Sequence, residues 1–138
     1  FSYCDRKERE VEQLMIVNES AENYLETILM LSKKLPVVRS VDIATELGFK
    51  KSSVSVAMKN LKEKEHITVT DAGFIYLTDS GRRIAEMIYE RHEILTSCLK
   101  TLGVDAAVAE EDACKIEHVI SEESFQAIKD HISKMKDR

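Results

Sequence analysis

The chain has 138 residues, of which 43% are hydrophobic and 33% are charged, and a formal net charge of -5. This length allows one or two small domains, and the mild acidity excludes a protein that meets nucleic acid with its whole surface. No apolar run reaches the length of a membrane span, and the first residues lack the apolar stretch and small-residue cleavage site that would predict a signal peptide. The three cysteines are too scattered to predict a disulfide scaffold. These features together lead us to expect a cytoplasmic protein. Because glycine, proline and aromatic residues are few, we expect it to be mainly helical.

The chain is predicted to begin with a charged arm over residues 1–17, followed by a helix from Ser20 to about Lys34. Ser20 is the predicted N-cap, because a serine side chain can accept a hydrogen bond from a backbone N–H of the first turn. Pro36 then ends the helix. The apolar residues that recur at helical spacing, and so predict its buried face, are Tyr24, Ile28, Leu31 and Leu35.

A pair of short helices comes next, and it predicts a helix-turn-helix. Residues 40–47 form an amphipathic helix that Ser40 caps and Gly48 ends. After a tight turn, a second helix begins with Ser52 or Ser53 as its N-cap. Its predicted inward residues are Val54, Ala57, Met58 and Leu61.

Two β-rich runs follow the helix pair, over residues 67–70 and 74–77. The turn at residues 71–73 contains a glycine, and this pattern is typical of a β-hairpin. A helix-turn-helix followed by a hairpin is a winged helix, which we expect to fill residues 18–80. Gly81 is predicted to lie in a turn before the next helix.

Positive charge gathers on the second helix of the pair, although the whole chain is acidic. Between residues 50 and 64 there are five lysines and one glutamate, and such a patch is what phosphate contacts require. The exposed face of the helix also carries short side chains, Val56 among them, of a size that fits a major groove. The residues predicted to contact double-stranded DNA are Arg39, Ser40, Lys50, Lys51, Ser52, Ser53, Ser55 and Lys59. The alternative is that the lysines form an ordinary solvated helix face.

Residues 81–138 are predicted to form an all-helical second domain. A long helix runs to about Leu102 and ends at Gly103, and Asp105 caps the next helix. Ser121 begins a final amphipathic helix. The predicted buried positions are Ile84, Ile88, Leu95 and Leu99 on the long helix and Phe125, Ile128, Ile132 and Met135 on the last.

The helix that Asp105 caps carries a cluster of metal-ligating side chains, Cys114, Glu117 and His118. Their spacing of i, i+3 and i+4 brings a thiolate, a carboxylate and an imidazole to one side of a helix, and Glu110 lies one turn earlier on the same stripe. Sulfur, nitrogen and oxygen donors together suit a first-row transition ion. On the long helix, His92 lies on the buried stripe and offers a further donor.

Each of these residues also has an ordinary structural interpretation. Cys114 can be a small buried apolar residue, and His92 or His118 can be a core histidine that bonds to a backbone carbonyl. A carboxylate and an imidazole beside an apolar stripe are nevertheless costly unless a cation compensates them. His66 and His131 lie in charged surroundings, and we predict that they are exposed and have no functional role.

Four stretches of the chain resemble the diphtheria toxin repressor family of metal-dependent transcription repressors, namely residues 20–28, 41–61, 90–95 and 112–121. The last stretch, which carries the Cys114, Glu117 and His118 cluster, is the most specific. The resemblance implies an N-terminal winged helix and a helical domain that both dimerises and binds metal. The metal ligands that it implies are Glu26, His92, Cys114, Glu117 and His118, with Asn23 and Glu110 at further ligand positions.

Two of the implied ligand positions bear on the identity of the metal. The manganese-responsive branch of the family has an aspartate at the place of Asn23 and a glutamate at the place of Cys114. A cysteine at the position of Cys114 is typical of the iron-responsive branch. That branch, however, has a methionine at the position of Asn23 and a glutamate at the position of Thr96. We therefore expect Mn²⁺ or Fe²⁺ as the cofactor, and the residues leave the choice between them open.

The expected function is that of a homodimeric repressor, not an enzyme, that binds a palindromic DNA operator when the metal is bound. An ion held between the first helix and the second domain would set the two recognition helices of the dimer about one turn of DNA apart. No membrane or small-molecule substrate is expected as a partner. Two alternatives stay open, a winged-helix regulator that responds to an organic effector and a small metalloenzyme that uses an open coordination position.

Overall fold

The computed structural model describes residues 19–136, with side chains as far as Met135. The predicted arm over residues 1–17 lies outside the described residues. The chain divides into two compact units, one ending at Glu86 and the other beginning at Met87. Among the described residues, no helix combines the length and the apolar character that a membrane crossing needs.

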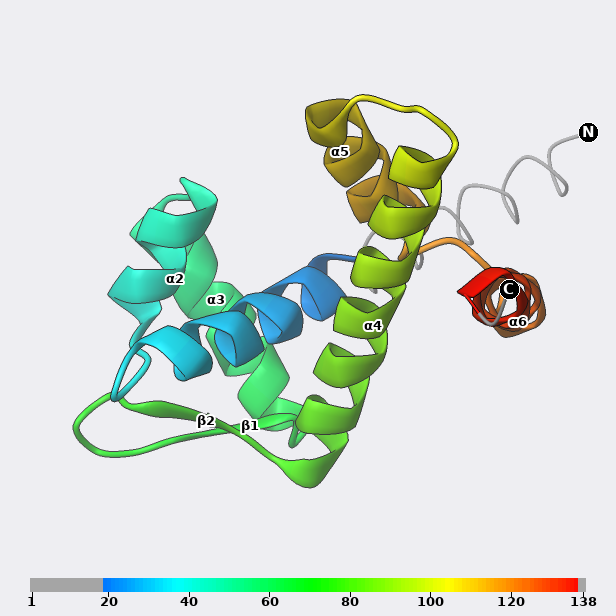
Figure 1. The fold of residues 1–138 in the computed structure, drawn as a ribbon. Helices are drawn as coiled ribbons and strands as arrows, with labels where there is room; N and C mark the ends of the chain where they lie inside the picture. Colours follow the sequence, from blue (N-terminus) through cyan, green and yellow to red (C-terminus); the bar gives the residue numbers. More distant parts are fainter. Residues whose placement is uncertain (1–18, 137–138) are drawn as a thin grey trace, which may run out of the picture. The chain divides into compact units, whose positions relative to one another are not determined.

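The first unit has the predicted order of a winged helix (Figure 1). A helix over residues 19–34 is followed by α2 (Ser40–Leu47) and α3 (Lys51–Glu63), and then by β1 (Ile67–Val69) and β2 (Ile75–Leu77). Gly48 joins α2 to α3 in the left-handed conformation, with φ of 68°, which a glycine adopts without a steric penalty. This arrangement confirms the predicted helix-turn-helix with a wing.

The starts of the helices differ from the prediction in their capping. Glu19 is already helical, so Ser20 is not the residue at which the first helix begins. The N-cap of α2 is Arg39, whose backbone N–H donates to Asp42 Oδ2 at 2.9 Å, and Ser40 is the first helical residue. The N-cap of α3 is Lys50, which makes no side-chain capping bond. The predicted serine caps are therefore wrong, and Ser52 and Ser53 are exposed within the first turn of α3.

The core of the first unit draws on all of its elements. Tyr24 packs its ring edge to face against Phe49 in the turn of the helix-turn-helix, with ring centroids 6.1 Å apart, and burial raises the pKa of the Tyr24 phenol. The buried apolar residues are Tyr24, Leu25, Ile28, Leu29, Leu31, Val38, Ile43, Ala44, Val54, Met58, Leu61, Ile67, Ile75 and Ala85. Helical spacing predicted six of these residues, Tyr24, Ile28, Leu31, Val54, Met58 and Leu61, whereas Leu35 and Ala57, which were also predicted to face inward, are half-buried.

The wing is an antiparallel pair of short strands with one further bridge. Ile67 pairs with Leu77 and Val69 with Ile75. The backbone N–H of Ile75 donates to the carbonyl of Val38 at 2.8 Å, so the segment just before α2 extends the wing by one bridge. The wing is therefore tied by backbone hydrogen bonds to the start of the helix-turn-helix.

A compact set of polar contacts forms the base of the wing. His66 is half-buried and its Nδ1 lies 3.0 Å from Ser80 Oγ, while the Thr78 hydroxyl donates to the carbonyl of Glu65 at 2.7 Å. Gly81 is buried inside α4 (Asp79–Thr101), against the backbone of His66. The prediction of a turn at Gly81 is therefore wrong, and His66 is more buried than predicted.

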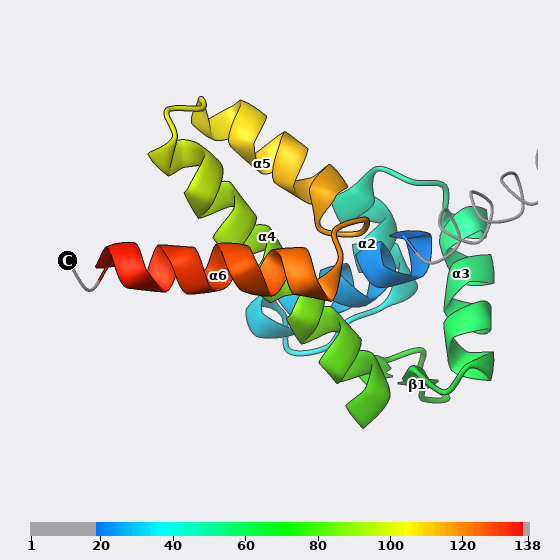
Figure 2. The same ribbon diagram turned by 90° about the vertical axis from the view of Figure 1, so that its right-hand side faces the viewer.

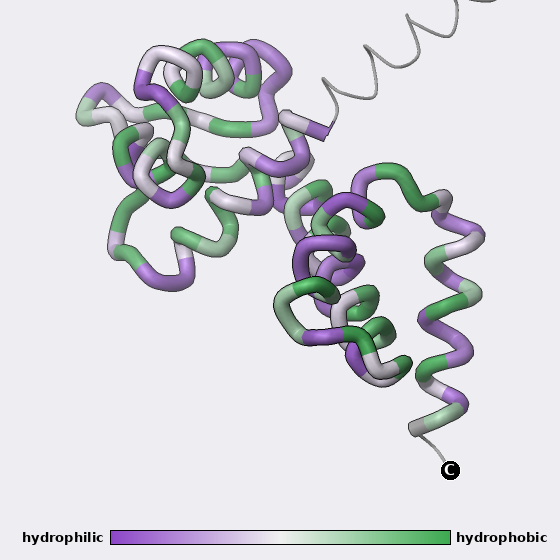
Figure 3. Tube along the Cα trace, turned by 90° about the horizontal axis from the view of Figure 1, so that it is seen from above, coloured by the Kyte–Doolittle hydropathy of each residue, from purple (hydrophilic) through white to green (hydrophobic). Residues whose placement is uncertain are grey.

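The second unit contains the rest of α4 together with α5 (Ala106–Ile116) and α6 (Glu122–Lys136) (Figure 2). Asp105 caps α5 as predicted, because its Oδ2 accepts from the N–H of Ala107 at 3.2 Å. Hydrophobic and hydrophilic residues alternate along α6, as in an amphipathic helix (Figure 3). Phe125 is buried on this helix, whereas Met135, which was predicted to face inward, is 54% exposed.

Candidate metal centre and nucleic-acid interface

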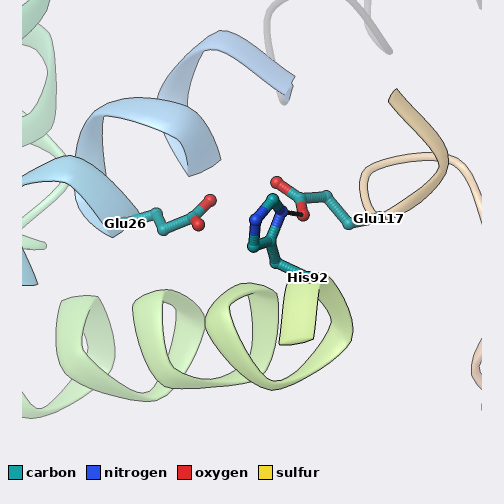
Figure 4. Close-up of side chains that lie close together, drawn as sticks. All are labelled: Glu26, His92 and Glu117. Atoms are coloured by element: carbon teal, nitrogen blue, oxygen red, sulfur yellow. Dashed lines mark hydrogen bonds and ion pairs between the residues drawn. The ribbon is translucent and has the colours of Figure 1, made fainter. Parts of the chain in front are cut away.

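A buried carboxylate between two imidazoles is the centre of the second unit's polar cluster. The Glu117 side chain is 0% exposed, and its Oε2 lies 2.8 Å from His92 Nδ1 (Figure 4). His118 Nε2 lies 3.4 Å from the other oxygen, Glu117 Oε1, and the His118 side chain is 7% exposed. Glu117 and His118, which helical spacing predicted to act together, therefore meet His92, the further donor predicted on the long helix, in one place within this unit.

The end of α5 determines how Glu117 and His118 are presented. The regular helix ends at Ile116, and Glu117 is its C-cap, with a helical backbone and an N–H that donates to the carbonyl of Ala113. Val119 and Ile120 then both donate to the carbonyl of Ile116, at 3.0 and 2.9 Å, which closes a tight turn. The prediction that the whole cluster lies inside one helix is therefore wrong, because Glu117 and His118 lie at its end.

The other predicted residues of this unit lie nearer to solvent. Glu110 is 71% exposed, and its Oε1 is 4.0 Å from His92 Nε2, at the limit of an ion pair. Cys114 is exposed one turn before Glu117, so the interpretation of Cys114 as a buried apolar residue is wrong. The Thr96 hydroxyl is buried without a hydrogen-bond partner among the described residues, where the iron-responsive branch would have a glutamate.

Two predicted ligand positions belong to the first unit and lie on its first helix. Glu26 is a buried carboxylate, only 7% exposed among the apolar residues of this helix. Asn23 lies one turn earlier and is half-buried, and its backbone carbonyl accepts a hydrogen bond from the Thr27 hydroxyl at 2.8 Å. A buried carboxylate on an apolar helix is unusual unless a cation or a hydrogen bond stabilises it.

Sequence reasoning missed Arg91, the neighbour of His92. Its Nη1 donates to the carbonyl oxygens of Glu117 at 3.2 Å and Ile120 at 3.0 Å, and its Nη2 is 2.9 Å from Glu122 Oε2. The sequence did contain a signal for this role, because Arg91 falls on the same buried helical stripe as Ile88 and Leu95. An arginine at a buried position is expected to have hydrogen-bond or ion-pair partners.

The donors present in the second unit fit a divalent transition metal. Two imidazole nitrogens and a carboxylate are a common ligand set for manganese, iron and zinc. A divalent ion would satisfy the carboxylate and both imidazoles at once.

The predicted DNA-contacting residues lie on the outer surface of the helix-turn-helix. Arg39 is exposed and its guanidinium lies over the Phe74 ring of the wing, 5.0 Å from the ring centroid. Val56 is 61% exposed on α3, whereas Val54 and Met58 face the core. The other exposed residues of the predicted set are Lys50, Lys51, Ser52, Ser53, Ser55 and Lys59, and Ser40 is half-buried.

Two family models together match most of the chain. Residues 16–72 match the iron dependent repressor N-terminal DNA binding domain, and residues 78–138 match the iron dependent repressor metal binding and dimerisation domain. The transcriptional regulator MntR of Escherichia coli O6:H1 is 32% identical over 111 residues, which are 80% of this chain and 72% of that protein. An uncharacterised HTH-type transcriptional regulator of Methanocaldococcus jannaschii is 31% identical over 88% of this chain and 99% of its own length.

The fold is also found among solved structures. A structure described as a manganese-dependent transcriptional repressor in complex with manganese superposes with a TM-score of 0.75 and 27% identity. The match covers 82% of this chain and 52% of that one, so this chain spans about half of the longer protein. With both domain models matched in order and relatives above 30% identity, the chain belongs to the iron-dependent repressor family, also called the diphtheria toxin repressor family.

Proposed function

We propose that this protein is a transcriptional repressor that binds DNA as a homodimer when Mn²⁺ or Fe²⁺ occupies the centre at Glu117. The observation that carries the proposal is the buried Glu117 carboxylate with His92 and His118 beside it, in a chain whose other unit is a winged helix. Family membership supports both halves of the proposal, because the two matched domains are a DNA binding domain and a metal binding and dimerisation domain. Such repressors are not enzymes, and they act in the cytoplasm, where the DNA is.

The proposed ligands come from both units. His92, Glu117 and His118 form the preassembled part, and Cys114 and Glu110 lie at its exposed edge. We propose that Glu26 and Asn23 of the first helix complete the coordination, which the family resemblance implies and which the buried carboxylate of Glu26 supports. The bound ion would supply the positive charge that holds the carboxylates of two separate elements together.

This ligand set gives the metal a way to control DNA binding. A ligand that joins the first helix to the second domain fixes the orientation of α3 relative to the dimer. Two recognition helices held about one helical turn of DNA apart then fit successive major grooves of a palindromic operator. Because binding equilibria are linked, DNA should in turn tighten metal binding by the same factor.

The choice between manganese and iron depends mainly on two ligand positions. Carboxylate and imidazole donors suit both ions, and the thiolate of Cys114 favours the softer one. The solved structure with 27% identity is described as a manganese-dependent repressor in complex with manganese. We therefore propose Mn²⁺ and Fe²⁺ as the two candidates for the physiological cofactor.

The proposal is tested by DNA binding with and without metal. Duplexes selected by the protein from a random pool, in the presence of Mn²⁺ or anaerobic Fe²⁺, should contain an inverted repeat, and a chelator should release them. Equal binding in manganese, iron and chelator would contradict the proposal. A metal content near zero after reloading, unchanged in Glu117→Ala, would instead favour a regulator that responds to an organic effector.

A further inference from the structure

A buried arginine holds the turn that presents two of the proposed ligands. Arg91 is 7% exposed, and the carbonyls that accept its hydrogen bonds, those of Glu117 and Ile120, begin and end the turn that contains His118. Its third hydrogen bond goes to the Glu122 carboxylate at the start of α6, and its guanidinium lies 5.5 Å from the centroid of the Phe125 ring. One side chain of α4 thus fixes the junction between α5 and α6.

One hydrogen bond of Arg91 satisfies a carbonyl at the end of α5, that of the C-cap Glu117. The last carbonyls of a helix have no intrahelical donor, and a cation near them also interacts favourably with the helix dipole. The Glu117 N–H donates to the carbonyl of Ala113, and the Glu117 carbonyl accepts from Arg91. The second carbonyl that Arg91 holds, that of Ile120, lies beyond the helix at the end of the turn. The backbone of Glu117 is therefore held from both sides.

We propose that Arg91 is a positioning residue for the metal centre, acting through the backbone of Glu117 and His118 and without touching the ion. This inference rests on the proposed function, because it assigns to Arg91 a role at the same centre. Groups that orient metal ligands commonly contribute 10–100-fold to metal affinity, which is the order of magnitude expected here. The placement of Arg91 beside His92 means that one turn of α4 both supplies a ligand and orients two others.

Only an arginine can make this set of contacts. Its planar guanidinium offers several donors in fixed directions, so that Nη1 reaches two carbonyls while Nη2 reaches a carboxylate. A lysine at this position could make one or two of these bonds and would not place a planar cation over the Phe125 ring. Lysine is therefore expected to restore part of the effect and not all of it.

A second contact between α4 and α6 provides a matched control. Lys129 on α6 forms an ion pair with Glu90, the residue before Arg91, and this hydrogen bond and the charge of Glu90 raise the pKa of the Lys129 ammonium. The Glu90 to Lys129 contact ties the same two helices together but does not touch the turn over residues 117–120. Removing this ion pair shows how much a weaker attachment of α6 alone changes Mn²⁺ affinity.

The experiment measures Mn²⁺ affinity by titration of the intact protein, following the electron paramagnetic resonance signal of free Mn²⁺. Thermal unfolding in the presence of a chelator reports the stability of each variant without metal. The variants are Arg91→Met, Arg91→Lys, Glu122→Gln and the control Lys129→Met. We expect the dissociation constant to rise about 10–100-fold in Arg91→Met, less in Arg91→Lys and Glu122→Gln, and less than about twofold in Lys129→Met.

Three results would overturn the inference or separate it from the proposed function. If Arg91→Met and Lys129→Met lower the chelator Tm but both bind Mn²⁺ as tightly as the wild type, Arg91 is only a structural anchor. If Arg91→Met does not fold cooperatively, unchanged Mn²⁺ affinity in both Arg91→Lys and Glu122→Gln likewise shows that Arg91 does not position the ligands. If the wild type itself binds neither Mn²⁺ nor anaerobic Fe²⁺ in a way that Glu117→Gln abolishes, the proposed function fails, and the role of Arg91 fails with it.

Discussion

Gly81 faces the carbonyl oxygen of His66 so closely that a methyl group on Gly81 would overlap that oxygen. The contact lies at the base of the wing, where the His66 carbonyl also accepts a hydrogen bond from the N–H of Thr78 at 3.1 Å. The start of α4 can approach the wing this closely only because residue 81 has no side chain. The contact therefore couples the first turn of α4 to the position of β1.

The first prediction concerns Gly81→Ala. Alanine is the better helix former by about 1 kcal/mol, so an unconstrained site in α4 would gain stability. The overlap with a backbone carbonyl forces a shift of the helix or the strand, and overpacking of this kind costs about 1–3 kcal/mol or more. We expect the overlap to outweigh the propensity gain, with a net loss in the free energy of unfolding measured with urea. Glu86→Ala, at an exposed position of the same helix, should change stability little.

The second prediction concerns the stabilisation that a bound metal gives. At a free Mn²⁺ concentration of 100 times the dissociation constant, binding to the folded state alone adds about 2.7 kcal/mol. Glu117→Gln keeps the shape of the side chain and removes its charge, so we expect most of this gain to disappear. The measurement is the difference in Tm between Mn²⁺ and chelator for each variant.

Glu111→Gln is the control for this experiment, because Glu111 is an exposed carboxylate on α5 that pairs with Lys115 at 3.7 Å. Surface pairs of this kind contribute little, so the Mn²⁺ effect on Tm should match that of the wild type. A Tm shift in Glu117→Gln as large as in the wild type would place the ion elsewhere.

The periodic pattern of the sequence predicted the helices, whereas contacts between distant segments could not be predicted from it. The spacing of residues such as Ile28, Val54 and Ile88 predicted the helices and their buried faces, because burial repeats with the helical period. The approach of Gly81 to His66 could not be predicted in this way, since it joins segments through tertiary packing. The same is true of Arg91 on α4, which holds the carbonyls of the turn between α5 and α6.

The candidate site was predicted in part, for a similar reason. Helical spacing brought Glu117 and His118 together correctly, but it could not predict that α5 ends at Ile116. Glu117 continues the buried stripe of Ala109 and Ala113 past that end, whereas Cys114 lies on the exposed side of α5. The N-cap of α2 was predicted wrongly because a serine is the usual N-cap residue, so Ser40 was chosen over Arg39. In the structure the capping bond at Arg39 comes from the Asp42 side chain in the first turn of α2, which accepts from the Arg39 N–H.

The third prediction tests Cys114 as a ligand. With Co²⁺ as a spectroscopic substitute, a thiolate ligand produces a sulfur-to-metal charge-transfer absorption that oxygen and nitrogen ligands do not. We expect this absorption in the wild type and its loss in Cys114→Ser, while Cys98→Ser retains it. Because Cys114 is exposed, Cys114→Ser should change the chelator Tm little. An unchanged absorption in Cys114→Ser would remove Cys114 from the ligand set.

A related substitution, Cys114→Glu, should shift the preference of the centre toward Mn²⁺. Carboxylate oxygen suits Mn²⁺, whereas thiolate suits softer ions. The quantity to measure is the ratio of the dissociation constants for Mn²⁺ and anaerobic Fe²⁺ in the two proteins. A ratio that stays the same would mean that the ligand at position 114 does not determine the choice of metal.

The fourth prediction concerns how α3 distinguishes bases. Val56 is 61% exposed between serines and lysines, and an apolar side chain at this place can contact the 5-methyl group of thymine in the major groove. Uracil differs from thymine by this methyl group alone, and burying one such group is worth about 0.8 kcal/mol, or roughly fourfold in affinity. We therefore expect the wild type to bind the selected operator about fourfold more weakly when the contacted thymine is replaced by uracil. Val56→Ala should bind both duplexes alike.

Lys59→Ala separates this base contact from general electrostatic binding. Lys59 is an exposed cation on the same helix, so its loss should weaken binding to the thymine and uracil duplexes by the same factor. It should also reduce the slope of log affinity against log salt by about 0.9 for each protomer, or about 1.8 for the homodimer, because one phosphate contact is lost in each half-site. If Val56→Ala kept the preference for thymine that the wild type shows, the methyl group would have to be recognised by another residue. The exposed serines of α3 would be the next candidates, since Ser52, Ser53 and Ser55 lie on the same helix.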